Sequence, residues 1–496
     1  MKKKEENKLK HPKILIGVFI LLMIILAFIT VPHDVLDATD IKDYTDTAKF
    51  FAGDYAAKQR ASHSILYGLM LSPYVALTDS FFLIKFSSVF FLILLILSIY
   101  YISGKDKRTL ILALFLPLIW YVTPWISPVP LSALLFLWAY YFIDKYNKDS
   151  KETDKGKIRY LIYSGLLVGL ASAFWTTVLY LSFFFLITFF YNKKFYSTWI
   201  FLLSLFVGFL PALIVDQMVY GFAFYSLIKH ISSAAIFFLY NGTYNQGFSS
   251  TILDRIIVLI FVPFYSYLLL KKENFVKNKA IVVFLVLTLL FILTNPQIRL
   301  LLVIAPIILI LIGNKLSDKQ FKIQIIIFII LSLLVITPYV IQGIYEIENG
   351  KYLQTAITEF NSLNLNYPPT EKIIVKDLEK IEKDYANEIF VVGNNNDDYR
   401  YLAHLYWGDQ LKEFVSIEDY NLYLENNSEI IKKRISSRAK IEERREVWIE
   451  IGIGKNSNDK TDYEAIKYAI SLEEDIDLEG FELVKEYDKL RVFEKA

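Results

Sequence analysis

The sequence predicts a polytopic α-helical membrane protein with a small α/β domain after its membrane part. Of its 496 residues, 55% are apolar, and the mean hydropathy is +0.39. Apolar stretches long enough to cross a membrane recur as far as residue 343, after which they shorten and charged residues become more frequent. The net charge of +2 is small for this length, so nucleic acid is not an expected partner.

Eleven apolar segments make up the predicted membrane part, residues 1–343. A window of about 20 residues, the length that crosses the hydrocarbon core, places them at residues 14–32, 82–102, 109–122, 129–143, 159–174, 176–191, 197–218, 254–270, 280–294, 298–313 and 322–342. The first segment is followed by no small-residue cleavage pattern, so we expect a retained helix and not a signal peptide. A further stretch, residues 63–78, is shorter and contains Pro73, and it could either span or lie in the interface.

The distribution of Lys and Arg decides between these two possibilities, because basic short loops stay on the cytoplasmic side. If residues 63–78 do not span, the basic N-terminus shares one side with the segments SGKDKR, DKYNKDSKETDKGKIR, NKK, KKENFVKNK and NKLSDKQFK. If they do span, every later loop is assigned to the opposite side of the membrane. We therefore expect eleven spans in a plasma membrane, a cytoplasmic N-terminus, and an outer loop (residues 33–81) that carries two interfacial helices.

The predicted C-terminal domain, residues 344–496, would then lie outside the cell. EIFVVG reads as a strand that ends at Gly393, NNNDD as a turn, and YRYLAHLYWGD as a helix. REVWIEIGIG and FELVKEYDKLRVFEKA supply further strand candidates. The strand–glycine–helix order would suit a nucleotide, but a dinucleotide fingerprint needs three glycines and only one is present.

Five aspartates recur at every third position in the outer loop: Asp34, Asp37, Asp40, Asp43 and Asp46. Steps of three advance about 300° on a helix, so only neighbouring pairs can act together. Thr39 and Asp40 stand where a helix N-cap belongs, and Gly53 is a stop signal. A capped amphipathic helix with solvated carboxylates accounts for most of these aspartates, but not for the pattern around Asp40.

The pattern Asp40-x-x-x-Tyr44-x-x-x-Ala48 resembles the signature in the first outer loop of GT-C glycosyltransferases, among them protein O-mannosyltransferases and lipid A aminoarabinose transferases. The order of features is also similar: a first span, a helix over residues 40–53, an interfacial helix over 63–78, and the basic loop SGKDKR after the next span. NPQIRLLLVIAP (residues 295–306) looks like the family's arginine-bearing entry to a late span.

This resemblance implies an inverting glycosyltransferase that moves a sugar from a polyprenyl-phosphate donor, such as a dolichyl-phosphate sugar, to a hydroxyl of a protein, glycan or lipid of the cell envelope. Asp40 would remove the proton of the acceptor hydroxyl, because the donor phosphate already is a leaving group. Asp43 could hold Mg²⁺ or Mn²⁺ together with Asp40, or only cap the helix.

Several other residues are candidates for substrate binding. Arg299 lies in an apolar stretch near the outer surface, where it could bind the leaving phosphate or snorkel to headgroups. The remaining candidates are Arg60, His63, Tyr44, Lys229 and His230. Asp216 could belong to the site or end its helix, and the tryptophans near the outer ends of the spans suit an aromatic belt or, less simply, sugar stacking.

Two other classes of function stay open. A transporter or flippase of a lipid-linked or small polar solute is the main alternative, although the sequence has no internal repeat and few charges at mid-span. A sensor would need a cytoplasmic output domain, which the sequence does not indicate. The lack of cysteine excludes disulfides and thiolate chemistry.

Overall fold

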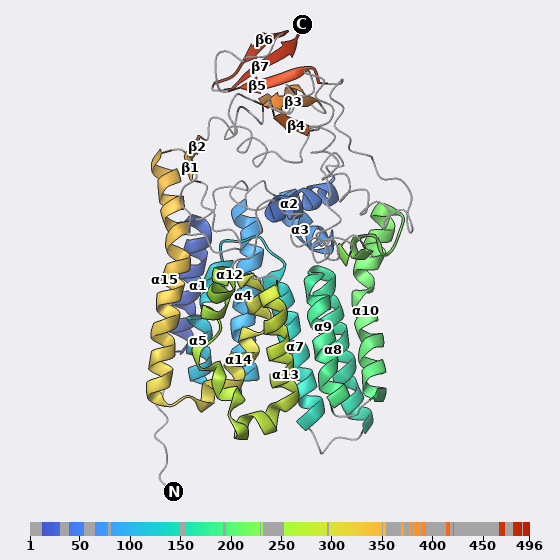
Figure 1. The fold of residues 1–496 in the computed structure, drawn as a ribbon, viewed down its shortest axis with the longest axis vertical. Helices are drawn as coiled ribbons and strands as arrows, with labels where there is room; N and C mark the ends of the chain where they lie inside the picture. Colours follow the sequence, from blue (N-terminus) through green and yellow to red (C-terminus); the bar gives the residue numbers. More distant parts are fainter. Residues whose placement is uncertain are drawn as a thin grey trace.

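The structure is a computed structural model, and the residues that it describes are 12–29, 39–53, 65–77, 81–148, 154–191, 195–228, 230–231, 252–294, 297–349, 351–353, 369–371, 377, 380–381, 383–385, 388–392, 413–416, 420, 466–471, 480–488 and 490–496. Most of them form a bundle of helices, and a five-stranded sheet lies beyond one end of that bundle (Figure 1). The short helices α2 and α3 lie across the same end, between the bundle and the sheet.

The helices of this part of the chain are α1 (Pro12–Ile29), α2 (Thr39–Ala52), α3 (Ile65–Leu77), α4 (Phe81–Ile102), α5 (Lys107–Leu114), α6 (Pro117–Val122), α7 (Val129–Lys148), α8 (Asp154–Phe174), α9 (Thr177–Tyr191), α10 (Phe195–Tyr220), α12 (Ile252–Ile260), α13 (Lys272–Thr294), α14 (Ala305–Ile312) and α15 (Asp318–Asn349). Three 3₁₀ segments join some of them: η1 (Phe264–Leu270), η2 (Ile298–Val303) and η3 (Gly313–Lys315).

All eleven predicted spans fall on helical segments, but three of them are broken. Residues 109–122 form α5 and α6, because Pro117 starts a new helix at its first position. Residues 254–270 divide into α12 and η1, and residues 298–313 into η2, α14 and η3. Among the described residues, the helices long and apolar enough to cross a membrane by themselves are Leu83–Ile102, Tyr196–Tyr220 and Asp318–Thr337.

Glycines allow α8 and α10 to pack very closely. A Cβ atom on Gly169 would lie 2.0 Å from the carbonyl oxygen of Leu205, and one on Gly208 would lie 2.2 Å from that of Leu166. Gly165 and Gly169 form a Gly-x-x-x-Gly pair on α8, the pattern through which membrane helices bring their backbones together. The backbones of these two helices therefore meet directly at the glycines.

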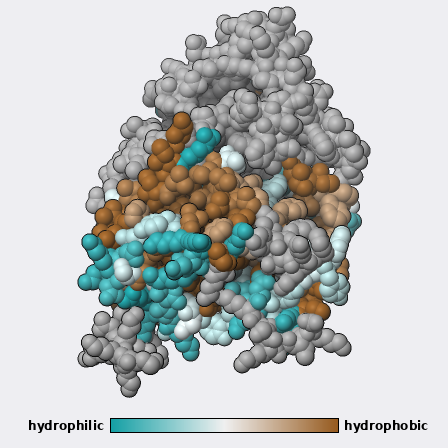
Figure 2. Space-filling view, turned by 60° about the horizontal axis from the view of Figure 1, so that its bottom comes forward, coloured by the Kyte–Doolittle hydropathy of each residue, from teal (hydrophilic) through white to brown (hydrophobic). Residues whose placement is uncertain are grey.

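We call the end of the bundle farther from α2 and α3 the basic end. Its described residues include a set of lysines and arginines: Lys105, Lys107, Arg108, Lys271, Lys272, Lys319 and Lys322. Figure 2, which turns this end toward the reader, shows hydrophilic side chains gathered below a hydrophobic band. The predicted basic segments SGKDKR, KKENFVKNK and NKLSDKQFK thus lie together at one end.

The basic end joins α5 to α15. Arg108 forms an ion pair with Asp318, donates a hydrogen bond of 2.9 Å to the carbonyl oxygen of Leu316, and lies 5.5 Å from the ring centre of Phe321. Asp106 caps α5 by accepting hydrogen bonds from the backbone nitrogen and the hydroxyl of Thr109, at 3.0 and 2.6 Å.

The sheet has the strand order β4-β3-β5-β7-β6. Its strands are β3 (Ile389–Val392), β4 (Glu413–Ser416), β5 (Tyr468–Ser471), β6 (Phe481–Glu486) and β7 (Arg491–Lys495), and a separate pair is formed by β1 (Lys351–Leu353) and β2 (Pro369–Glu371). Strand β3 lies between β4 and β5 and is parallel to both, whereas β7 is antiparallel to β5 and β6. The predicted strands at EIFVVG and in FELVKEYDKLRVFEKA are confirmed, while REVWIEIGIG and YRYLAHLYWGD lie outside the described residues.

Candidate active site

The candidate site is built on α2, which carries the Asp40-x-x-x-Tyr44-x-x-x-Ala48 pattern. A spacing of four residues puts these three positions on one face of the helix. Tyr44 and Ala48 are buried on that face, where the ring of Tyr44 meets that of Tyr67 on α3 edge-on at 5.0 Å. Gly53 ends the helix as predicted, with a positive φ of 113°. Asp40 thus lies in the first turn of α2, and the packing of Tyr44 and Ala48 in the next two turns holds this helix in place.

A glycine brings α3 against α2. A Cβ atom on Gly68 would lie 2.4 Å from Cγ2 of Thr47 and 3.3 Å from the carbonyl carbon of Thr47. The two helices therefore touch at backbone distance, only one turn from the Tyr44–Tyr67 pair. Sequence reasoning gave no role to Gly68, although a glycine inside an apolar helix often marks a close contact.

Buried hydroxyls connect α3 to the bundle. The hydroxyl of Tyr67 lies 3.4 Å from that of Ser88 on α4, and the backbone nitrogen of Ser127 donates to the Ser88 hydroxyl at 3.3 Å. All three residues are buried. Because Ser127 belongs to the connection between α6 and α7, this network ties the α2–α3 pair to two further parts of the membrane domain.

Lys85 lies beside this network and was not predicted. It is on α4, next to Ile84, which packs with Tyr44 and Tyr67, and only 5% of its surface is exposed. Burying a lysine in a membrane domain is costly. Its signal in the sequence is a single lysine in the apolar stretch FFLIKFSSVFF.

Arg299 is also buried, with 9% of its surface exposed. It lies in the 3₁₀ segment η2 instead of a regular helix, and its Nε donates to Oε1 of Gln297 at 3.3 Å. Lys85, Arg299 and Asp216 are the buried charged residues of the bundle in the part of the chain that the structure describes.

Asp216 has a structural role. Its two carboxylate oxygens accept hydrogen bonds from the backbone nitrogen and the hydroxyl of Ser226, at 2.9 and 2.6 Å. The carboxylate is buried and holds the segment that follows α10, so it does not end the helix toward water as one of the two expectations had it.

His230 stacks on Tyr180 of α9, with the ring centres 5.7 Å apart. Leu227, three residues earlier, packs in one cluster with Phe51 of α2 and Ile65 of α3. The segment after α10 therefore runs from the α2–α3 pair to α9. The side chains of Asp40 and Asp43, and the whole of Arg60, His63 and Lys229, lie outside the described residues.

Several aromatic residues are buried in the structure. Tyr44 is buried against Tyr67 and takes part in the packing of α2, and its role in substrate binding stays a prediction. The aromatic residues assigned to a lipid-facing belt are also buried, because they pack inside the bundle; they are Trp120, Tyr121, Trp125 and Trp175. Trp120, for example, donates a hydrogen bond of 3.0 Å to the carbonyl oxygen of Leu114.

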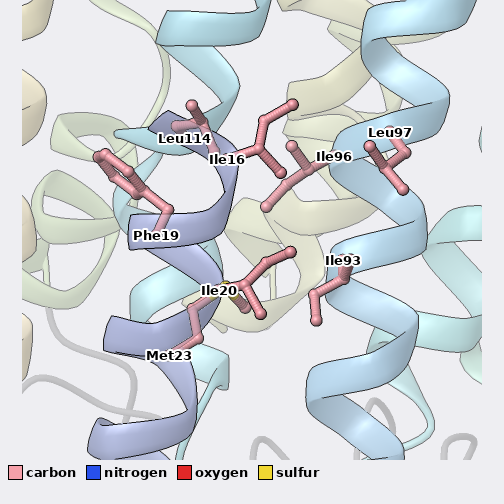
Figure 3. Close-up of a pocket in the computed structure, with 8 residues that line it drawn as sticks. All are labelled: Ile16, Phe19, Ile20, Met23, Ile93, Ile96, Leu97 and Leu114. Atoms are coloured by element: carbon pink, nitrogen blue, oxygen red, sulfur yellow. The ribbon is translucent and has the colours of Figure 1, made fainter. Parts of the chain in front are cut away.

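A recess between α1 and α4 has no chemistry of this kind. Figure 3 shows Ile16 and Ile20 of α1 facing Ile93, Ile96 and Leu97 of α4, and every residue that lines the recess is apolar. Among the described residues, no group of three or more acidic or histidine side chains could hold a metal ion. The metal expectation concerns Asp40 and Asp43 and stays a prediction.

Comparison with known proteins places this geometry in a known fold. No family model and no curated protein matches the chain. The crystal structure of ArnT from Cupriavidus metallidurans bound to undecaprenyl phosphate matches with a TM-score of 0.57 and 9% identity, over 97% of this chain and 98% of that one. The chain has the fold of ArnT. The apo structure of the same enzyme matches with a TM-score of 0.52 and 10% identity, over 97% of both chains.

ArnT is an aminoarabinose transferase of the GT-C family. The predicted resemblance to that family is therefore confirmed at the level of the fold, and so is the prediction of a polytopic helical membrane protein. The undecaprenyl phosphate in the ArnT structure is a lipid phosphate of the kind that the sequence predicted as part of the donor.

Proposed function

We propose that this protein transfers a sugar from a polyprenyl-phosphate sugar to an acceptor hydroxyl, with inversion at the anomeric carbon. The observation that supports this most strongly is the position of α2. The helix that carries Asp40 in its first turn is anchored through Tyr44 and Ala48 beside a buried lysine, in a chain with the fold of ArnT.

Asp40 is the proposed general base. It takes the proton of the acceptor hydroxyl, whose oxygen forms a bond to the anomeric carbon of the sugar. The bond between that carbon and the phosphate oxygen breaks, and the polyprenyl phosphate leaves with both bonding electrons. A carboxylate on a firmly packed helix suits this role, because general-base catalysis requires the base within hydrogen-bond reach of the hydroxyl.

Lys85 and Arg299 are proposed to bind the leaving phosphate. Negative charge grows on that phosphate in the transition state, and fixed cations in a site of low dielectric stabilise it strongly. Gln297 would support Arg299, to which its side-chain oxygen is hydrogen-bonded. Arg60, His63, Lys229 and His230 are further candidates for contacts to donor or acceptor, and Asp43 could hold Mg²⁺ or Mn²⁺ with Asp40.

The reaction is proposed to take place on the outer face of a plasma membrane. The end of the bundle next to α2 and α3 lies opposite the basic end, and lysine-rich loops stay in the cytoplasm. The N-terminus would then be cytoplasmic and the sheet extracytoplasmic.

Transfer of radiolabelled sugar from a panel of polyprenyl-phosphate sugars to membrane acceptors tests the proposal. We expect Asp40→Asn to lower the transfer rate by about 10²–10⁴-fold at matched expression, while Asp34→Asn, a control in the same outer loop, leaves it unchanged. Equal rates for wild type and Asp40→Asn would overturn the assignment. Labelled donor that crosses vesicles without being consumed would support a flippase instead.

A further inference from the structure

Aromatic rings from three helices form one connected cluster near the basic end. Its members are Tyr101 of α4, Trp138, Tyr141 and Phe142 of α7, and Tyr160 and Tyr163 of α8. Tyr101 stacks on Trp138 at 5.8 Å, and Phe142 lies 6.1 Å from Tyr160 and 5.4 Å from Tyr163. The indole nitrogen of Trp138 donates to the hydroxyl of Ser98 at 3.0 Å, which fixes the ring at the centre of the cluster.

The cluster is open to the outside of the bundle. Tyr101 and Tyr163 have 55% and 47% of their surfaces exposed, and Ile162 between the rings of α8 is exposed as well. On a membrane helix, such a surface faces lipid. By contrast, Trp120, Trp125 and Trp175, near the opposite end, are buried inside the bundle.

Two cations are held over rings of this cluster. The guanidinium of Arg159 lies 5.0 Å from the ring centre of Tyr160 and donates to its hydroxyl at 3.2 Å. The ammonium of Lys145 lies 5.6 Å from the ring centre of Tyr141. Both side chains are exposed. Contact with an aromatic face restrains a long cationic side chain near the surface.

The height of these cations matches lipid headgroups. Lys145 is three residues from the end of α7 and Arg159 five residues from the start of α8, so each lies within about 8 Å of the end of its helix. Trp138, seven residues before Lys145 on α7, lies deeper in the bundle than that cation, toward the depth of the acyl chains.

We propose that this cluster of α4, α7 and α8 is a binding site for an anionic phospholipid of the leaflet at the basic end. Arg159 and Lys145 bind the headgroup phosphate. Tyr101, Trp138 and Tyr163 contact the glycerol region and the upper acyl chains. The charge complementarity between two exposed cations and an anionic headgroup, placed above an open aromatic surface, decides in favour of such a lipid.

Native mass spectrometry of the purified full-length protein tests the site, with phosphatidylglycerol and phosphatidylcholine as probes. We expect wild type to retain phosphatidylglycerol in preference to phosphatidylcholine. The double variant Lys145→Gln/Arg159→Gln should bind phosphatidylglycerol about tenfold more weakly, since each cation near an anionic surface contributes to its affinity. Binding of phosphatidylcholine should not change.

The control is Lys319→Gln/Lys322→Gln, which removes the same charge from exposed lysines of α15 at the same end, away from α7 and α8 (Figure 1). It should bind phosphatidylglycerol as wild type does. An equal loss in both double variants would mean a diffuse charge effect and would overturn the site, as would a lack of preference for phosphatidylglycerol in wild type. The unfolding temperature in phosphatidylcholine shows whether each variant is folded.

Discussion

The two ends of the helix bundle hold their charged side chains in opposite ways. At the basic end, the side chains of Arg108 and Asp318 are 40% and 82% exposed and pair with one another. At the end next to α2 and α3, Lys85 and Arg299 are almost completely buried. An exposed ion pair contributes little to stability, whereas burying a charge is costly. This difference supports the proposal that Lys85 and Arg299 bind the leaving phosphate at the α2–α3 end.

Removing the buried charges of Lys85 and Arg299 is the strongest test of this difference between the two ends. We expect Lys85→Met and Arg299→Met each to lower sugar transfer by about 10²–10³-fold, the effect of removing one group that stabilises developing charge. The unfolding temperature should stay within a few degrees of wild type. Transfer assays and thermal unfolding in the same membranes or detergent measure both quantities.

The opposite result is equally informative. A buried cation that serves only as a structural ion-pair partner would, when removed, destabilise the protein by about 3–5 kcal/mol. Variants that unfold early, with a transfer rate per folded molecule equal to that of wild type, would therefore contradict a role of Lys85 or Arg299 in phosphate binding.

A second test disturbs the close contact between α2 and α3. Gly68→Ala places a Cβ atom within 2.4 Å of Thr47, which we expect to destabilise the protein by about 1–3 kcal/mol through overpacking and to lower transfer by displacing Asp40. Unfolding temperature and transfer rate are the measurements. Gly17→Ala on α1, where a Cβ atom would meet nothing within 4 Å, should change neither.

The same test has a compensating variant. Thr47→Gly removes the atoms that the new Cβ would meet, so the pair Gly68→Ala/Thr47→Gly should recover part of the lost transfer. If Gly68→Ala alone transfers sugar as wild type does, the close contact between α2 and α3 does not position the catalytic helix.

The paired charges of the basic end should matter far less. Arg108→Met is expected to lower the free energy of unfolding by about 0.2–1 kcal/mol, the range for exposed ion pairs, and to leave the transfer rate unchanged. The same assays as for Lys85→Met apply. A large loss of transfer from Arg108→Met would show that exposure is no guide to function in this protein.

The smallest effect that we expect is at the exposed ion pair between Asp384 and Lys485 of β6. Asp384 accepts hydrogen bonds from Lys485 at 2.5 Å and from Tyr487 at 2.6 Å, and the hydrogen bond from Lys485 is the main reason why the pKa of Asp384 is lowered in the folded protein. A lowered pKa stabilises the fold above the pKa of the unfolded chain, about 3.9, and the contribution is lost as the pH falls through the folded value.

We therefore expect Asp384→Asn to destabilise the sheet at pH 7 by about 0.5 kcal/mol, and the difference from wild type to shrink as the pH falls below the unfolded value of about 3.9 and through the lowered pKa of the folded protein. Hydrogen exchange of residues 480–496, corrected for intrinsic rates, measures it. Glu482→Gln, at another exposed position of β6, is the control. A difference that persists at low pH would assign the effect to packing and not to charge.

The sequence predicted the helices of the membrane part well, because a chain rarely repeats long apolar runs unless they cross a membrane. Pro117 marked the break between α5 and α6 in the sequence, but the 3₁₀ segment η2 depends on how neighbouring segments pack and left no such signal. In the candidate site, the spacing of Asp40, Tyr44 and Ala48 was visible in the sequence, and so was Arg299 at the edge of a span.

Lys85 was missed for a physical reason. A lysine near the end of a span can snorkel to the surface, so its burial becomes visible only when α2 and α3 are seen to cover the end of α4. Tyr67 and Ser88 were missed because hydroxyl contacts between separate helices leave no periodic signal. The tryptophans were predicted to face lipid but are buried, because the position of a residue along a span does not tell which side of the helix faces lipid.

The ion pair between Arg108 and Asp318 joins residues that are 210 positions apart in the chain. At 5–20 residues per second, a ribosome needs about 10–40 s to synthesise the chain between them. Throughout that time α5 has entered the membrane without α15, supported by its Asp106 cap and by contacts with α4. The membrane domain therefore closes at its basic end late in synthesis, and truncation before Asp318 would leave α5 without the contact that joins the beginning of the domain to its last helix.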